Sequence, residues 1–282
     1  MTISEFHKLF QDSMTLSAGT LKIYDYSFKW LIQIVGDMNL EELTGLHWEQ
    51  YRRKRLSEIS PVTVNIELRS LRAAMYRAMD WKIITSNPFS RQKLCLVPEQ
   101  PPTFFSVEDF EKLIAAITDD WFKRITIFSV LTGLRRSEIT NLQYSDINFT
   151  QKTLIVQSKA DFKTKSGRRR VIAVSDTAMQ ILAAACQSEY IFMYKDKKIS
   201  PALLTKKFKK AVKRSKLKDQ RLHFHSLRHT FASWLAQKGT SIYEIQKLLG
   251  HSDIKTTQIY AHLLPNELHN TVGKLEGMVP SY

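Results

Sequence analysis

The stretch LLGHSDIKTTQIYAH (residues 248–262) carries the pattern that decides the fold of this chain. Its histidine, His251, directly follows a Leu-Gly pair, and Tyr260 lies nine residues after that histidine. Upstream, Ser241 and Glu244 have the spacing of a capping box and the glycine before His251 is a helix stop. We therefore expect a helix that ends just before His251, followed by a further helical segment that carries Tyr260. A histidine at a helix end often only caps carbonyls, and a lone tyrosine is usually a core residue, so the accompanying residues decide.

Two segments further upstream supply arginine and histidine side chains. TGLRRSE (residues 132–138) contains Arg135, and HSLR (residues 225–228) opens a predicted helix. At 100° per residue, His225 and Arg228 lie together, away from the apolar stripe of that helix. The stripe consists of Leu227, Phe231, Trp234 and Leu235. Alone, this segment would be explained by an amphipathic helix with ordinary polar residues.

In this order and spacing, four motifs resemble those of the tyrosine recombinase (phage integrase) family. They are Gly-Leu-Arg ending at Arg135, His-x-x-Arg at residues 225–228, Leu-Gly-His ending at His251, and Tyr-x-His beginning at Tyr260. The resemblance extends over residues 103–270. It covers the residues before 103 only by their helical character and position.

The resemblance implies a role for each of these side chains. Arg135 and Arg228 would clamp the scissile phosphate and stabilise its pentacoordinate transition state, because arginine presents a permanently charged, planar fork of donors. His225 and His251 would add hydrogen bonds and proton transfer. Tyr260 would attack in line, form a 3′-phosphotyrosyl bond and release a 5′-hydroxyl. A tyrosine with a pKa near ~10 needs a nearby acceptor to become a good nucleophile.

In this family the leaving oxygen receives its proton from a lysine on a β-hairpin. The best match in this chain is Lys165, with Lys163 and Lys159 as close rivals, because basic hairpin loops shift register easily. Glu138 would support the Arg135 region without direct chemistry, and a surface salt bridge is an equal alternative for it.

The sequence predicts no metal and no cofactor. His225 and His229 have the spacing of zinc ligands, but no Cys-x-x-Cys or His-Glu-x-x-His accompanies them. A Walker-type loop and clustered carboxylates for Mg²⁺ are also missing, which argues against a two-metal nuclease.

The expected fold is mostly α with a small β-sheet. A helical core-binding (SAM-like) domain would span residues 1–95, a proline-containing linker residues 96–103, and a mixed α/β tyrosine-recombinase catalytic domain with a C-terminal tail residues 104–282. Residues 153–157 and 170–174 are rich in β-branched residues and predict a hairpin.

Several helices have recognisable caps and stripes. Ser60 is the predicted N-cap of a helix with the buried stripe Val64, Leu68, Leu71, Met75 and Ala78. Ser106 begins another helix, and residues 121–142 predict one or two helices broken near Gly133.

The large positive net charge of the chain indicates a polyanionic binding partner. The chain has 42 Lys plus Arg against 27 Asp plus Glu, a net charge of +15. The cluster Arg52-Arg53-Lys54-Arg55 favours a phosphate-facing surface, although such runs are usually solvated helix faces. Eight of the thirteen residues 206–218 are Lys or Arg. A membrane surface or a partner protein would also suit that basic helix, but beside the motifs above double-stranded DNA is the better interpretation.

The location expected is the cytoplasm, and the nucleoid when the protein is bound to DNA. Cys95 and Cys186 cannot form a disulfide framework, and neither a secretion signal nor a bilayer-spanning run is visible, so we expect no membrane association.

The resemblance further implies a tetramer that joins two DNA recombination sites and exchanges strands through a four-way junction. Integration, excision and dimer resolution, and accessory DNA-bending or directionality proteins, stay open. The chain starts almost directly at the core-binding domain, which favours a simple integrase or a Xer-type resolvase. The tail, with Leu263, Leu264, Leu268, Val272 and Leu275, would pack on a neighbouring subunit or on its own domain.

Two alternatives remain at this stage. A type IB topoisomerase shares the nucleophile but relaxes DNA as a monomer. A catalytically inactive DNA-binding protein would bind DNA with a steep salt dependence and form no covalent adduct.

Overall fold

The computed structural model describes residues 1–265, except 99, 165–166, 186–187 and 220. The chain divides into two compact units, Met1–Gln100 and Pro101–Tyr282, which are described separately below. The predicted general acid Lys165, and Cys186, Leu268, Val272 and Leu275, lie outside the described residues.

The first unit is helical. Its elements are α1 (Ile3–Ser13), α2 (Ala18–Val35), the 3₁₀ turn η1 (Leu40–Glu42), α3 (Gly45–Leu56) and α4 (Pro61–Asp80). The Ser60 hydroxyl accepts the Thr63 N–H, as predicted for an N-cap, and all five residues of the predicted α4 stripe are buried. These side chains pack against an aromatic core that includes Phe6, Phe10 and Phe28.

The expectation that residues 52–55 form a phosphate-facing surface is wrong for Arg55, because its side chain is buried. Arg55 shares a face of α3 with the buried Trp48 and Tyr51, and it is 1% exposed. Its guanidinium donates to both carboxylate oxygens of Glu67 at 2.9 and 2.8 Å and lies 4.0 Å from the ring centroid of Trp30. The helical period therefore turns one cation of the run into the core, where a buried carboxylate pairs with it.

The second unit contains most of the helices. They are α5 (Val107–Ala116), α6 (Asp120–Thr132), α7 (Arg136–Thr140), α8 (Asp176–Ala183), α9 (Pro201–Arg214), α10 (Ser226–Gln237), α11 (Ile242–Leu249) and α12 (Lys255–Gln258), with 3₁₀ turns η2 (Tyr144–Asp146) and η3 (Ala261–Leu263). Ser106 and Ser241 cap α5 and α11 as predicted, and the helical stretch is broken at Gly133.

A three-stranded antiparallel sheet accompanies these helices. Its strands β1 (Ile147–Asn148), β2 (Thr153–Val156) and β3 (Arg170–Ala173) lie in the order β1-β2-β3. Leu154 pairs with Ile172, and both side chains enter the core, so the predicted hairpin is confirmed. A second, two-stranded sheet pairs β4 (Met193–Tyr194) with β5 (Lys197–Lys198).

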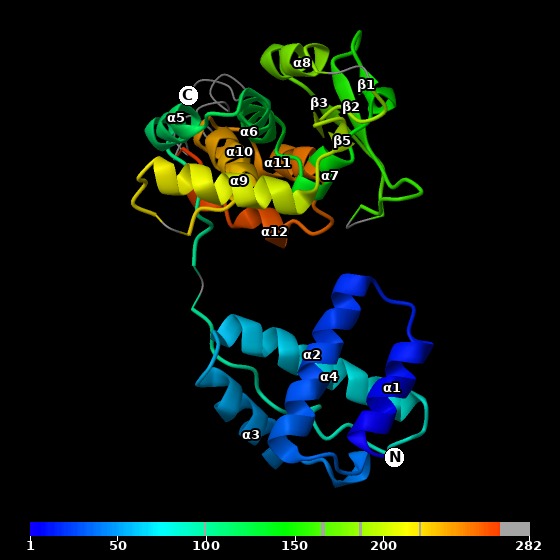
Figure 1. Cartoon of the computed structure of the whole chain (residues 1–282). Helices are drawn as coiled ribbons and strands as arrows, with labels where there is room; N and C mark the ends of the chain where they lie inside the picture. Colours follow the sequence, from blue (N-terminus) through cyan, green and yellow to red (C-terminus); the bar gives the residue numbers. More distant parts are fainter. Residues whose placement is uncertain (99, 165–166, 186–187, 220, 266–282) are drawn as a thin grey trace, which may run out of the picture. The chain divides into compact units, whose positions relative to one another are not determined.

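Helix α10 lies in the interior of the second unit, beside α6 and α11 (Figure 1). The residues of its predicted apolar stripe pack against the core, but the helix is also buried on further faces that the stripe did not predict. Small side chains face its neighbours there and allow close packing: Ser226, Thr230, Ala232, Ser233 and Ala236. The Thr230 hydroxyl donates to the Ser226 carbonyl at 2.7 Å, so it is buried without an unpaired proton. A search for hydrophobic periodicity does not identify small or hydroxylated residues such as these as buried.

None of the helices in the described part of the chain combines the length and apolar character needed to cross a membrane.

The Arg55–Glu67 pair predicts a large effect on stability. We expect Arg55→Met to lower the free energy of unfolding by about 3–5 kcal/mol, because it leaves the Glu67 carboxylate buried without its cation. Urea unfolding followed by circular dichroism measures this. The matched control is Arg53→Met on the exposed face of α3, with an expected change within about 0.5 kcal/mol. Equal effects of the two variants would contradict the assignment.

Candidate functional site

Arg228 is the most constrained cation of the second unit. Its side chain is almost fully buried, at 3% exposure. Nη1 donates to the Gly133 carbonyl and Nη2 to the Leu249 carbonyl, both at 2.7 Å. Burial, together with the positive charges of Arg135 and Arg170, lowers the pKa of Arg228 to about 9. The guanidinium thus joins α10 to the ends of α6 and α11 while its charge is only partly compensated.

Two glycines make this arrangement possible. Gly133 and Gly250 both have left-handed backbones, with φ of +60° and +66°. A Cβ on Gly133 would collide with the ring of Phe231, and a Cβ on Gly250 with the side chain of Arg170. Each position therefore needs glycine for its conformation and for space.

Glu138 organises two further arginines. Its carboxylate accepts Nη1 of Arg135 at 3.0 Å and the two Nη groups of Arg170 at 2.9 and 2.7 Å. It also accepts the backbone N–H of Arg135. Burial alone would raise the pKa of Glu138, but the hydrogen bonds and charge of Arg170 and Arg135 outweigh it and hold the pKa below its usual value. A surface salt bridge, the alternative for Glu138, is excluded by its 3% exposure.

The cluster has more cations than anions. Among the described residues, Arg135 and Arg170 bind the Glu138 carboxylate, and Arg228 interacts with it electrostatically. Three guanidiniums and one carboxylate leave an excess of two positive charges. Sequence analysis missed Arg170, because it begins a predicted strand within a run of three arginines and its partner is thirty-two residues away. Such a cluster suits a bound dianion or a phosphodiester.

His225 and His251 lie near this cluster. His225 is an exposed residue, but desolvation of its ring and the neighbouring cationic and imidazole groups lower its pKa to about 3. Burial and similar neighbours lower the pKa of the half-buried His251 to about 4. Nδ1 of His251 lies 2.9 Å from the Thr257 hydroxyl, which fixes its ring. Both imidazoles are therefore neutral at pH 7 and can each donate one hydrogen bond and accept another.

Tyr260 lies between α12 and η3, rather than within one helix as the sequence suggested. The residue is 1% exposed, and burial raises the pKa of its phenol to about 12, although the charge of Arg228 opposes this. Its oxygen lies 2.6 Å from Nδ1 of His229. Sequence analysis considered His229 only as a zinc ligand. In the described part of the chain, no group of three or more His, Cys, Asp or Glu has the arrangement of a metal site.

The hairpin lysines differ in their surroundings. The amine of Lys159 contacts the buried carboxylate of Asp146 and the Asn141 carbonyl. The amine of Lys159 is therefore held away from the hairpin loop by these two contacts. Lys163 is exposed, and Lys165 lies outside the described residues.

Two surface hollows border the cluster. Arg135 and His225 help to line the first, and Arg170 and His251 help to line the second. The remaining lining residues include the basic side chains Arg136, Arg168, Arg169 and Lys247. An anion can therefore approach the cluster from solvent along basic walls.

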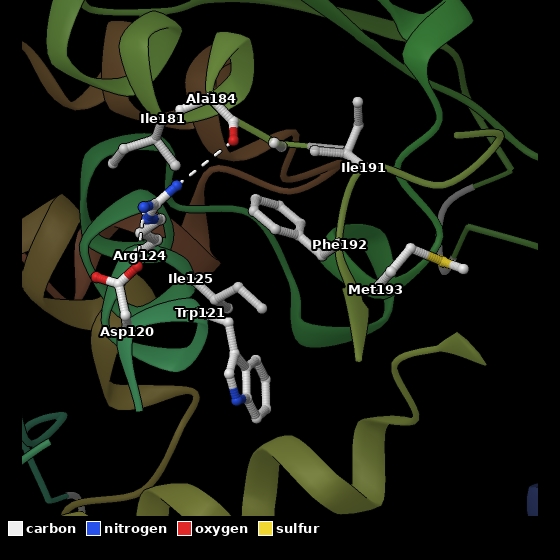
Figure 2. Close-up of a pocket in the computed structure, with 10 residues that line it drawn as sticks. Asp120, Trp121, Arg124, Ile125, Ile181, Ala184, Ile191, Phe192 and Met193 are labelled. Atoms are coloured by element: carbon white, nitrogen blue, oxygen red, sulfur yellow. Dashed lines mark hydrogen bonds and ion pairs between the residues drawn. The ribbon is translucent and has the colours of Figure 1, made fainter. Parts of the chain in front are cut away.

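A third hollow lies between α6, the end of α8 and β4 (Figure 2). It is lined largely by apolar side chains, including Trp121, Ile181 and Phe192, and Arg124 points across it toward the Ala184 carbonyl. No residue predicted for catalysis lines this hollow.

Comparison with known proteins agrees with this geometry. The profile of the phage integrase family matches residues 103–267. The chain belongs to this family. The predicted resemblance and the predicted enzyme class are thereby confirmed: the protein is a tyrosine recombinase, in a family that cleaves and rejoins DNA through a tyrosine intermediate.

Individual relatives support the assignment. A tyrosine recombinase of Thermosipho africanus is 32% identical over 200 residues, which are 68% of this chain and 69% of that protein. The fold is similar to that of a lambda integrase (75–356) dimer bound to a COC′ core site, with a TM-score of 0.80, 20% identity and coverage of 94% of this chain and 97% of that one. A lambda integrase tetramer bound to a Holliday junction gives a TM-score of 0.76 at 20% identity, over 90% of this chain and 78% of that one. The predicted fold class, mostly α with a small sheet, is confirmed.

The Glu138 cluster predicts a pH-dependent contribution to stability. Because the folded-state pKa of Glu138 is depressed, its stabilisation is fully present above its unfolded pKa of about 4.3 and is lost as pH falls through the folded-state value. We expect Glu138→Gln to cost about 1.5–3 kcal/mol at pH 7, with the difference from wild type shrinking below about pH 4. Thermal unfolding between pH 3 and pH 7 measures it.

The control for this experiment is Asp80→Asn, which removes an exposed ion pair with Arg77 and should change little at any pH. A Glu138→Gln penalty that stays constant down to pH 3 would show that the carboxylate charge is not what holds the arginines.

Proposed function

We propose that this recombinase cleaves duplex DNA at a specific site through a 3′-phosphotyrosyl intermediate, with Tyr260 as the nucleophile. The observation that carries the proposal is that the Tyr260 oxygen lies 2.6 Å from Nδ1 of His229, the residue that directly follows the buried Arg228 on α10. A phosphodiester that enters the cluster supplies the missing negative charge. The phosphorus atom of that phosphodiester then lies next to the phenol oxygen that attacks it.

Arg135 and Arg228 bind the non-bridging oxygens in this scheme. Glu138 fixes the direction of Arg135, and two backbone carbonyls fix that of Arg228, so little reorganisation is needed as charge builds on the phosphorane. His225 and His251, both neutral, add hydrogen bonds to the same oxygens. Arg170 shares the Glu138 carboxylate and contributes to the positive field.

The leaving 5′-oxygen needs a proton. We assign this role to Lys165, with Lys163 as the alternative, since Lys159 is held by Asp146. The phosphotyrosyl bond conserves the energy of the broken phosphodiester, so attack by a second DNA hydroxyl completes strand exchange without a nucleotide or a metal.

The partner is a double-stranded DNA recombination site. Helix α9 presents exposed lysines along its outer face and buries Leu204, Phe208, Ala211 and Val212 on the other. Lysines in this arrangement bind a phosphate backbone and release its condensed counterions, so the affinity falls as the salt concentration rises. Assembly as a tetramer on two sites is supported by the lambda integrase tetramer. We infer a cytoplasmic location from the proposed action on DNA. Accessory proteins and docking of the tail on a neighbouring subunit remain part of this proposal.

Covalent trapping tests the proposal. DNA fragments from the source genome that become attached to the wild-type protein identify the site, and a nicked suicide duplex is then built on that site. We expect a protein–DNA band with wild type and none with Tyr260→Phe, because only the hydroxyl differs. Arg228→Ala should lose adduct formation by at least about 10²-fold.

Outcomes against this proposal are specific. Binding without a band in either protein would leave an inactive DNA-binding protein. Relaxation of any supercoiled plasmid without joining of defined sites would favour a type IB topoisomerase.

The proton donor can be identified by changing the leaving group. We expect Lys165→Ala to slow cleavage by about 10²–10⁴-fold, and a 5′-bridging sulfur in place of oxygen to restore the rate, because a thiolate leaves without a proton. Lys163→Ala is the parallel variant, and Lys152→Ala, on an exposed ion pair before β2, is the control. Restoration for Lys163→Ala and not for Lys165→Ala would move the role to Lys163.

A further inference from the structure

His229 makes a contact that the scheme above does not use. Its Nδ1 lies 2.6 Å from the hydroxyl oxygen of Tyr260. Its ring packs edge-to-face against the ring of His225, with a centroid distance of 5.1 Å. The residue follows Arg228 directly on α10. A side chain that touches the attacking atom is therefore attached to the same helical turn as an arginine of the phosphate site.

The direction of this hydrogen bond follows from what each group can do. Within the part of the chain that the structure describes, Nδ1 of His229 is the hydrogen-bond partner that the Tyr260 hydroxyl has. If Nδ1 carried a proton and donated it, the buried phenol proton would have no acceptor, which costs about 1–3 kcal/mol. Burial also lowers the pKa of His229 to about 4, so the imidazole is neutral at pH 7 and one nitrogen has a free lone pair. The hydroxyl donates and Nδ1 accepts.

The geometry of α10 makes this contact a rigid one. Arg228 is tied to two carbonyls, and Thr230, on the other side of His229, is buried and accepts the Phe105 N–H at 3.0 Å. The backbone at His229 therefore has little freedom. Tyr260, by contrast, lies between two short elements, the four-residue helix α12 and the three-residue 3₁₀ turn η3. Elements this short fix the position of a side chain only weakly by themselves.

We propose that His229 is a positioning residue for the nucleophile: its Nδ1 holds the Tyr260 hydroxyl at a fixed place relative to the phosphate-binding Arg228. The inference rests on the proposed function of Tyr260. One buried helix then sets both the position of the phosphate and the position of the oxygen that attacks it. An error of about 1 Å between reacting groups costs on the order of 10²-fold in rate, which is the size of effect this contact can control.

Three substitutions at His229 test the proposal on the suicide duplex described above. Asparagine places an acceptor close to the position of Nδ1, glutamine places one near the position of Nε2, and alanine places none. We expect His229→Ala and His229→Gln to form the covalent adduct about 10²-fold more slowly, and His229→Asn to stay within about tenfold of wild type. DNA affinity should be unchanged in all three.

A matched control is Trp234→Phe. It removes another half-buried polar contact of α10, the indole N–H that donates to the Phe105 carbonyl, and should leave adduct formation unchanged. Equal slowing by asparagine, glutamine and alanine would mean that His229 only fills space, and would overturn the proposal. Adduct formation by His229→Ala at or above the wild-type rate would also overturn it.

A second measurement needs no DNA. In ¹⁵N-labelled protein, Nδ1 of His229 should resonate as an unprotonated acceptor, and Tyr260→Phe should shift it, with His229→Asn providing the assignment. A protonated Nδ1, or no shift, would overturn the contact itself. If wild type forms no adduct while this shift is present, the proposed function has failed and the contact has not.

Discussion

The buried guanidinium of Arg228 is the interaction on which the second unit depends. It lies on the central helix and donates to the carbonyls that follow α6 and end α11, so three segments distant in sequence share one cation. Burying a charge is costly unless it is paired, and here carbonyl oxygens and the more distant Glu138 supply only part of the compensation. The lowered pKa of Arg228 expresses that deficit. In the function that we propose, a phosphodiester supplies the missing negative charge.

This constraint explains why the neighbouring residues are what they are. Gly133 supplies one of the two carbonyls and Gly250 follows the residue that supplies the other, and neither has room for a Cβ. Glu138 directs Arg135 and Arg170 without neutralising the cluster, so the donors are aimed before substrate arrives. Preorganised donors of this kind stabilise developing charge more than flexible ones do, because they do not have to reorient during the reaction. The contacts of Glu138 and Arg228 that stabilise the folded second unit are therefore the same contacts that orient the hydrogen-bond donors proposed to bind the phosphate.

Sequence patterns predicted the features that depend on near neighbours. Local chemistry predicted the serine caps at 60, 106 and 241 and the hairpin at 153–174. Family resemblance, carried by the motifs around Arg135, Arg228 and Tyr260, predicted the candidate site residues. The features that were missed depend on partners far along the chain. Arg170 becomes informative only through Glu138, His229 only through Tyr260, and Arg55 only through Glu67. Burial of α10 on further faces escaped notice because serine, threonine and alanine carry no hydrophobic signal.

We propose that the phenol oxygen of Tyr260, which lies 2.6 Å from Nδ1 of His229, becomes covalently linked to DNA. Mass spectrometry of the trapped adduct, after digestion with nuclease and protease, identifies the modified residue directly. We expect a nucleotide remnant, joined through its 3′-phosphate, on the peptide that contains Tyr260. A remnant on any other of the ten tyrosines, or on a serine, would contradict this proposal.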